Sequence, residues 1–148
     1  MGWDGKTIVY GGEGDTLSMR HTKTGKLIRS FPIKGHPNRA IALSRQGSLL
    51  AAGSAAEIIM WNRHYKKKLF QLKGHSEVVS SLVISSDSQV LISGSHDLTV
   101  RRWNANTGEH IDTLTGHQAP IHSVACSLDG TVIVSGSADN TVKIWQQR

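Results

Sequence analysis

Cysteine is almost absent from this sequence of 148 residues, in which Cys126 is the only one. A single cysteine cannot form a disulfide within the chain, which fits a reducing compartment. We interpret Cys126 as a small buried hydrophobic residue rather than a reactive thiol.

Long apolar runs are missing as well. No stretch of about 18 apolar residues could cross a membrane, and the first residues lack the apolar stretch of a secretion signal. We therefore expect no transmembrane segment and a cytoplasmic location, with a nuclear location as the alternative. A compact chain of this length could bury roughly 68–70% of its unfolded surface in one domain.

The charge is divided unequally between the two halves of the sequence. Residues 1–73 hold thirteen lysines and arginines against four acids, whereas residues 74–148 hold four against seven, which together give the net charge of +6. A basic first half raises the prospect of an anionic partner. Lysine and arginine on solvated strand edges also protect sheets from aggregation, so both interpretations stand.

No long segment has helical periodicity, but short segments alternate with a period of two and are rich in β-branched residues. Turn residues such as Ser86-Asp87-Ser88 and Leu128-Asp129-Gly130 separate them. The pattern predicts an all-β chain of short hairpins. The clearest strands are expected at Val78 to Ile84, Val90 to Ser93, Val100 to Trp103, Ile121 to Ser127, Val132 to Ser135 and Val142 to Trp145.

One segment occurs twice, displaced by 42 residues. Each copy has a Gly-His pair, a Ser-Gly-Ser, an Asp, a Thr-Val and a Trp, from Gly74 to Trp103 and from Gly116 to Trp145. A period of about 40–45 residues with these features is typical of a four-stranded propeller blade. The sequence resembles the WD40 repeat family over essentially its whole length, although Asn62, Asn104 and Gln146 replace the Asp of the Trp-Asp pair that names the family.

The resemblance implies WD40-type blades, each a four-stranded antiparallel sheet. We expect about 14 strands over four blade positions in one propeller or part of one. The units are a degenerate blade at 1–34 that lacks its first strand, an eroded repeat at 35–73, a repeat at 74–115, and a repeat at 116–148 that lacks its fourth strand. Propellers of this family typically close with seven blades. We therefore expect a piece of a longer protein or a partial copy, with completion by further repeats or another chain as the alternative.

The resemblance also implies a buried hydrogen-bonded set in each sound repeat. It joins the Gly-His histidine, a second-strand Ser, the following Asp and the third-strand Trp. The matching residues are His75, Ser93, Asp97 and Trp103 in one repeat and His117, Ser135, Asp139 and Trp145 in the next. In the eroded repeat, Ala52 and Ala56 take the Ser and Asp positions, so His36 and Trp61 lack two partners.

These side chains are the types of a hydrolase triad, but we predict a structural role. A nucleophile needs an exposed oxygen, an oxyanion hole and a single site, whereas this set recurs with each repeat and includes a Trp. Three of the eight histidines are Gly-His members about 40 residues apart, and the others show no paired ligand spacing. We predict no catalytic residue, no metal and no cofactor.

Family resemblance places a partner on the face that carries the Gly-His loops and the turns between second and third strands. We expect a protein or peptide ligand there, and the predicted contact residues are Asn38, Arg39, Ser76, Glu77, His96, Gln118 and Ala138. The predicted function is a non-catalytic scaffold for protein interactions.

A basic cluster around one tyrosine suggests the alternative function. Arg63, Lys66, Lys67 and Lys68 flank His64 and Tyr65 in a loop between third and fourth strands. These side chains could neutralise the phosphates of RNA or of an anionic lipid, or could form a solvated loop.

Overall fold

Strands and turns make up the described part of the chain. The computed structural model describes residues 5–11, 14–34, 40–46 and 48–146, and these contain no helix. The 14 strands form four antiparallel sheets in which neighbours in sequence are neighbours in space. The prediction of an all-β fold with 14 strands over four blade positions is confirmed.

The sheets follow one another along the chain. The first contains β1 (Thr7–Gly11), β2 (Thr16–His21) and β3 (Leu27–Pro32). The second contains β4 (Ile41–Leu43), β5 (Leu49–Ser54), β6 (Glu57–Asn62) and β7 (Lys67–Leu72). The third contains β8 (Val79–Ile84), β9 (Val90–Ser95), β10 (Val100–Asn104) and β11 (His110–Leu114). The fourth contains β12 (Ile121–Cys126), β13 (Val132–Ser137) and β14 (Val142–Gln146).

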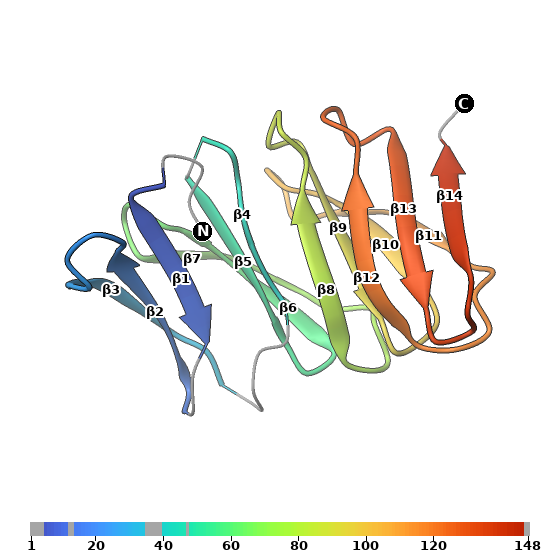
Figure 1. Cartoon of the computed structure of the whole chain (residues 1–148), viewed down its shortest axis with the longest axis horizontal. Helices are drawn as coiled ribbons and strands as arrows, with labels where there is room; N and C mark the ends of the chain where they lie inside the picture. Colours follow the sequence, from blue (N-terminus) through green and yellow to red (C-terminus); the bar gives the residue numbers. More distant parts are fainter. Residues whose placement is uncertain (1–4, 12–13, 35–39, 47, 147–148) are drawn as a thin grey trace.

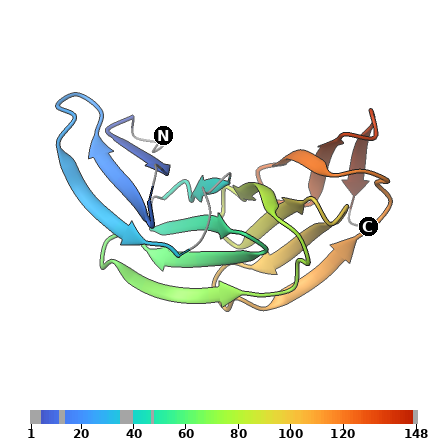
Figure 2. The ribbon, with the colours of Figure 1, turned by 90° about the horizontal axis from the view of Figure 1, so that it is seen from below.

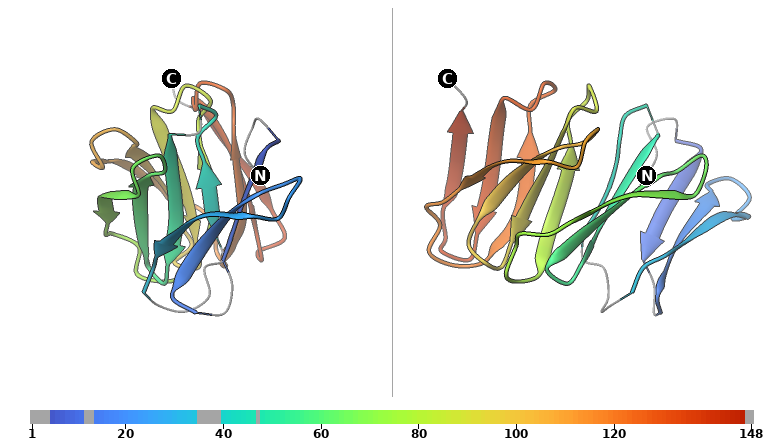
Figure 3. Two further views of the ribbon diagram at one scale, coloured as in Figure 1. Left: turned by 90° about the vertical axis from the view of Figure 1, so that its left-hand side faces the viewer. Right: turned by 180° about the vertical axis from the view of Figure 1, so that it is seen from behind.

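The four sheets stand side by side in chain order and form an open arc (Figures 1 and 2). The first strands β4, β8 and β12 lie on the concave side of the arc, and β7 and β11 lie on its convex side (Figure 2). Seen from behind, β7 and β11 are in front (Figure 3). The two ends of the arc are therefore the first and fourth sheets.

Each pair of neighbouring sheets encloses its own apolar core. Leu17 and Phe31 of the first sheet pack with Leu50 and Trp61 of the second. The other face of the second sheet, which includes Met60, packs on the third. Ile92 and Val100 of the third sheet then pack on Ile121, Val124 and Ile133 of the fourth. Because β-strand side chains alternate between faces, one strand can serve two cores.

Burial shows which sheets are covered on both faces. All six residues of β5 and five of the six in β9 are buried. Along β14, exposed and half-buried residues alternate, and Val142 and Ile144 are 69% and 71% exposed. The fourth sheet therefore has one covered face and one face open to solvent among the described residues.

Asparagine at the second position of the family's dipeptide retains a capping role. Asn104 Oδ1 accepts hydrogen bonds from the backbone N–H groups of Asn106 and Thr107, at 2.9 and 3.0 Å. Asn62 Oδ1 does the same for His64 and Tyr65, at 3.0 and 3.2 Å. An amide oxygen accepts these bonds as a carboxylate would. These turns therefore keep their side-chain hydrogen bonds although Asn replaces the Asp of the family.

Within the described residues, no helix is long and apolar enough to cross a membrane.

Candidate functional site

His75 joins two strands of the third sheet through both of its ring nitrogens. Its Nδ1 lies 2.7 Å from Asp97 Oδ2, and its Nε2 lies 2.7 Å from Ser93 Oγ. The same serine oxygen accepts a 2.9 Å hydrogen bond from Trp103 Nε1. Asp97 can only accept when ionised, so Nδ1–H is the donor, and Nε2 is left to accept the serine proton.

The fourth sheet contains the same arrangement. His117 Nδ1 lies 2.7 Å from Asp139 Oδ2, and His117 Nε2 lies 2.8 Å from Ser135 Oγ. Trp145 Nε1 donates to Ser135 Oγ at 2.9 Å. The corresponding distances in the two sheets agree within 0.1 Å. Two repeats with the same residue types thus reach the same geometry.

These two sets are closed to reactants. The imidazole side chains of His75 and His117 are 0% exposed, and Ser93 and Ser135 are also 0% exposed. Each serine oxygen already contacts both an imidazole and an indole. A nucleophile has to reach its substrate, so this geometry serves to brace the sheet.

The two aspartates extend the sets into the loops that precede β8 and β12. Asp97 Oδ2 accepts from the backbone N–H of Ser76 at 3.2 Å, and Asp139 Oδ2 accepts from that of Gln118 at 3.0 Å. Burial raises the pKa of Asp97, but the Thr99 hydroxyl and His75 outweigh it and hold that pKa below its usual value. The carboxylates therefore stay ionised and anchor the loops.

The second sheet has no equivalent set among its described residues. Ala52 pairs with Ile59 as Ser93 pairs with Arg101, so a methyl group occupies the serine position. The turn from Ser54 to Glu57 is one residue shorter than its counterpart from Ser95 to Thr99, and its two inner residues are alanines. Trp61 Nε1 consequently has no hydrogen-bond partner in the described part of the chain.

The first sheet replaces the set with different chemistry. Arg20 pairs with Ile8 as Trp103 pairs with Leu91, which places Arg20 at the tryptophan position. Its Nε donates a 2.7 Å hydrogen bond to Tyr10 Oη, and Tyr10 stands at the serine position. A cation and a phenol therefore meet where the other sheets join an indole to a serine.

The predicted partner face lies along the lower edge of the molecule in Figure 1 and faces the viewer in Figure 2. Asn38 and Arg39 fall outside the described residues, and so does His36. The exposed side chains on this face are Ser76, Glu77, Gln118 and Ala138, while His96 is half-buried. His96 and His122, from neighbouring sheets, meet edge to face with ring centroids 6.4 Å apart.

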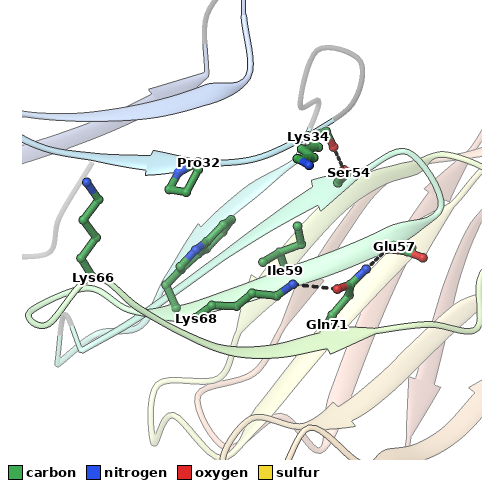
Figure 4. Close-up of a pocket in the computed structure, with 9 residues that line it drawn as sticks. Pro32, Lys34, Ser54, Glu57, Ile59, Lys66, Lys68 and Gln71 are labelled. Atoms are coloured by element: carbon green, nitrogen blue, oxygen red, sulfur yellow. Dashed lines mark hydrogen bonds between the residues drawn. The ribbon is translucent and has the colours of Figure 1, made fainter.

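The predicted basic cluster is divided by the fold. Arg63 is half-buried, and its Nη1 donates to Thr7 Oγ1 of the first sheet at 3.3 Å. Lys66 and Lys68 line a cavity of about 400 Å³ (Figure 4). Lys67 is exposed but does not line it. The sequence therefore singled out Lys66 and Lys68 but did not indicate the cavity that they line.

The cavity lies between the first and second sheets, and part of its lining comes from residues that sequence reasoning missed. Lys34 follows β3, while Trp61 and Ile59 come from β6. The full lining is Pro32, Lys34, Ser54, Glu57, Ile59, Trp61, Lys66, Lys68 and Gln71. Lys34 is 32 positions from Lys66 in sequence, and no local motif links them.

Metal ligands are not grouped in the described part of the chain, where no three His, Cys, Asp or Glu side chains gather as an ion would require. Burial raises the pKa of Cys126, so its thiol is held protonated rather than as a reactive thiolate.

Comparison with proteins of known sequence gives partial matches. Protein ROOT INITIATION DEFECTIVE 3 of Arabidopsis thaliana is 33% identical over 81 residues, which are 54% of this chain and 18% of that protein. Transcription factor unc-37 of Caenorhabditis elegans is 32% identical over 99 residues, which are 66% of this chain and 16% of that protein. The chain thus spans less than a fifth of either relative.

Solved structures match over almost the whole chain. The structures of U3-55K and of the RRP9 WD40 repeats each give a TM-score of 0.90 over 98% of this chain and 46% of theirs, at 25% and 26% sequence identity. The arc described above is therefore about half the length of those chains.

The family profile described as "WD domain, G-beta repeat" matches residues 66–104 and 108–146. Each match begins near the last strand of one sheet and ends with the third strand of the next, so the sequence repeat is offset by one strand from the sheet. The two matches cover just over half of the 148 residues, and the sheets have the blade geometry of solved relatives: the chain belongs to the WD40 repeat family.

Proposed function

We propose that this chain is a non-catalytic interaction module that holds a protein or peptide on its Gly-His loop face. The observation that carries the proposal is that the loops on this face have a backbone held by hydrogen bonds but side chains that are exposed. Ser76 and Gln118 are exposed, yet the backbone of each is tied to a buried set through an aspartate. In this proposal the units 1–34, 35–73, 74–115 and 116–148 act as one propeller domain or part of one.

Further hydrogen bonds hold the same loops. Ser95 Oγ donates to the Glu77 carbonyl at 3.0 Å, and the His96 N–H donates to the Val78 carbonyl at 2.9 Å. Ser137 Oγ donates to the Ala119 carbonyl at 2.8 Å. A surface that is already ordered loses less entropy when a partner binds. This rigidity supports a role in recognition.

The name of one relative, transcription factor unc-37, describes that protein and leaves the partner of this chain open.

Binding of RNA or anionic lipid receives less support, because Arg63 faces Thr7 and Lys67 does not line the cavity. The described part of the cluster forms no continuous basic track of the kind that follows a phosphate backbone. The cytoplasmic or nuclear location stays a prediction.

The test compares two faces of the molecule. A double variant, Glu77→Arg with Gln118→Arg, reverses and adds charge on the Gly-His loop face. The control, Glu109→Arg, makes the same charge reversal as Glu77→Arg, but in the loop between β10 and β11, on the opposite face. We expect the double variant to capture about tenfold less, or lower amounts still, of the proteins that the wild-type chain captures, because charge opposed to a partner weakens association.

Capture is measured by quantitative mass spectrometry on the tagged chain. The control is expected to retain the wild-type set, and all three chains are expected to unfold within about 0.5 kcal/mol of one another, as is usual for surface changes. Equal capture by all three chains, or equal loss in the control, would show that this face is not the binding site.

A further inference from the structure

We propose that the cavity between the first and second sheets binds a phosphate monoester carried on an apolar body. The cavity reaches from Lys34 and the turn between β5 and β6, beside the Gly-His loop face, to Lys66 in the turn between β6 and β7. It would take a small phosphorylated group in addition to the ligand of that face, so it extends beyond the proposed function. Its lining contains three lysines and one glutamate, Lys34, Lys66, Lys68 and Glu57, which leaves an excess of two positive charges. A phosphate monoester carries about −1.5 to −2 at pH 7, which matches that excess.

The lysine ammonium groups are available to a ligand. Lys68 Nζ donates to the neutral amide of Gln71 at 2.7 Å. Glu57, the one acid of the lining, is engaged by Gln71 and by Lys73, whose Nζ lies 3.4 Å away. In the part of the chain that the structure describes, neither Lys34 nor Lys66 has an ion pair. Figure 4 shows these two lysines well apart, with Pro32 between them in this view.

An unused donor points to the same ligand chemistry. Trp61 is 2% exposed and lines the cavity, but Ala52 removes the acceptor that Ser93 and Ser135 offer to the other two tryptophans. An indole that borders the cavity and has no acceptor for its N–H within the described residues can donate to a phosphate oxygen. The cavity thus offers lysine and indole donors to an anionic group.

The backbone conformation at Lys66 supports a functional role for this side chain. Lys66 has a φ of +55°, in the left-handed region that non-glycine residues rarely occupy. At the equivalent turn positions of the first and third sheets stand Gly25 and Gly108, with φ of +66° and +76°. Only the turn beside the cavity carries a lysine in this conformation. Strain of this kind tends to occur at functional sites.

The shape of the cavity favours a monoester over a nucleic acid backbone. A volume of about 400 Å³ falls within the usual range for small-ligand sites, and Pro32 and Ile59 provide apolar wall for an organic group. A diester carries one charge per phosphate and needs an extended track. The ligand is therefore a free phosphomonoester or a phosphorylated side chain of a partner peptide.

The experiment titrates the full chain with phenyl phosphate and with a short phosphotyrosine peptide, by calorimetry and by ¹⁵N-resolved NMR of the tryptophan indoles. We expect saturable binding and a shift of the Trp61 indole signal, with the signals of Trp103 and Trp145 unchanged. Tighter binding of the peptide would assign the site to a protein partner. Equal or tighter binding of phenyl phosphate would assign it to a free small molecule, and both results support the proposal.

Four variants define the site. Lys34→Gln and Lys66→Gly are each expected to weaken binding about fivefold or more, and the second also relieves the strained turn, so it is expected to fold. Ala52→Ser gives Trp61 an internal acceptor and is expected to weaken binding without removing a charge. Lys67→Gln, the matched control outside the cavity, is expected to bind like the wild type.

Several results would overturn the proposal. These are no saturable binding of either probe, an unmoved Trp61 signal, or equal weakening by Lys67→Gln and Lys66→Gly. Competition by a single-stranded oligoribonucleotide that depends on Lys67 would assign the basic region to nucleic acid instead.

Discussion

At the scale of single residues, each serine in the hydrogen-bonded sets supports two larger side chains. Ser93 Oγ contacts both His75 Nε2 and Trp103 Nε1 in a fully buried position. Ser93→Ala leaves two buried groups unsatisfied, and we expect a loss of about 1–3 kcal/mol in unfolding free energy. Urea denaturation measures it, with Ser123→Ala, at an exposed position of β12, as the control. Equal stability of the two variants would contradict the role of Ser93.

The titrating residues of these sets predict a response to acid. Burial lowers the pKa of His75 against the opposing effect of Asp97, and the Thr141 hydroxyl lowers the pKa of Asp139 well below its usual range. The pKa of Asp97 is also lowered, as described above. All three groups therefore bind protons more readily in the unfolded chain, and folding stability falls as pH falls.

Two pH windows are expected from these directions. The contribution of His75 to folding stability is present above about pH 6.5, the usual histidine pKa, and is lost as pH falls below that value. The aspartate contributions begin to disappear below about pH 4. Thermal unfolding between pH 7.5 and 3 should therefore show a falling melting temperature in both windows. A melting temperature that rises between pH 7 and 5.5 would contradict the assignment for His75.

At the scale of strands, the sequence was sufficient to predict the β-strands, because alternation and turn residues are local signals. The predicted strand from Val90 to Ser93 corresponds to β9 (Val90–Ser95), and the one from Val142 to Trp145 corresponds to β14 (Val142–Gln146). The cavity could not be found in this way. It depends on where Lys34 of one repeat lies relative to Lys66 of the next, and that placement is set by the core between the sheets rather than by periodicity. Arg63 was misleading for the same reason, since its partner Thr7 belongs to another sheet.

Equivalent glycines in neighbouring strands provide a matched prediction about sheet packing. A Cβ on Gly94 of β9 would lie 2.8 Å from methyl carbons of Ile121 and Val124, whereas a Cβ on Gly136 of β13 would have no atom within 4 Å. β-Branched side chains cannot easily turn away. We expect Gly94→Ala to destabilise the fold by about 1–3 kcal/mol and Gly136→Ala to be neutral or slightly stabilising. Chemical denaturation of both variants measures this, and equal losses would contradict the packing.

At the scale of the whole molecule, repetition explains both the order of the arc and its open end. Val100 of β10 is fully buried against the fourth sheet, while its counterpart Val142 of β14 is 69% exposed. The open face of the fourth sheet therefore repeats a surface that elsewhere binds a neighbouring sheet. Gly136 repeats the contact point of Gly94, without the covering side chains.

This open face predicts self-association of the chain. Val142 and Ile144 form an exposed apolar pair on β14, whose outer edge pairs with no strand among the described residues. Exposed apolar strand edges associate, and lysine on an edge strand prevents it. In sedimentation velocity we expect the wild-type chain to associate as its concentration rises, and the double variant Val142→Lys with Ile144→Lys to stay monomeric. Leu128→Lys removes an equally exposed side chain and should still associate, because Leu128 lies in the turn between β12 and β13 and not on β14. A wild-type chain that stays monomeric at every concentration would show that the repeated surface needs a true blade, rather than a second copy, to cover it.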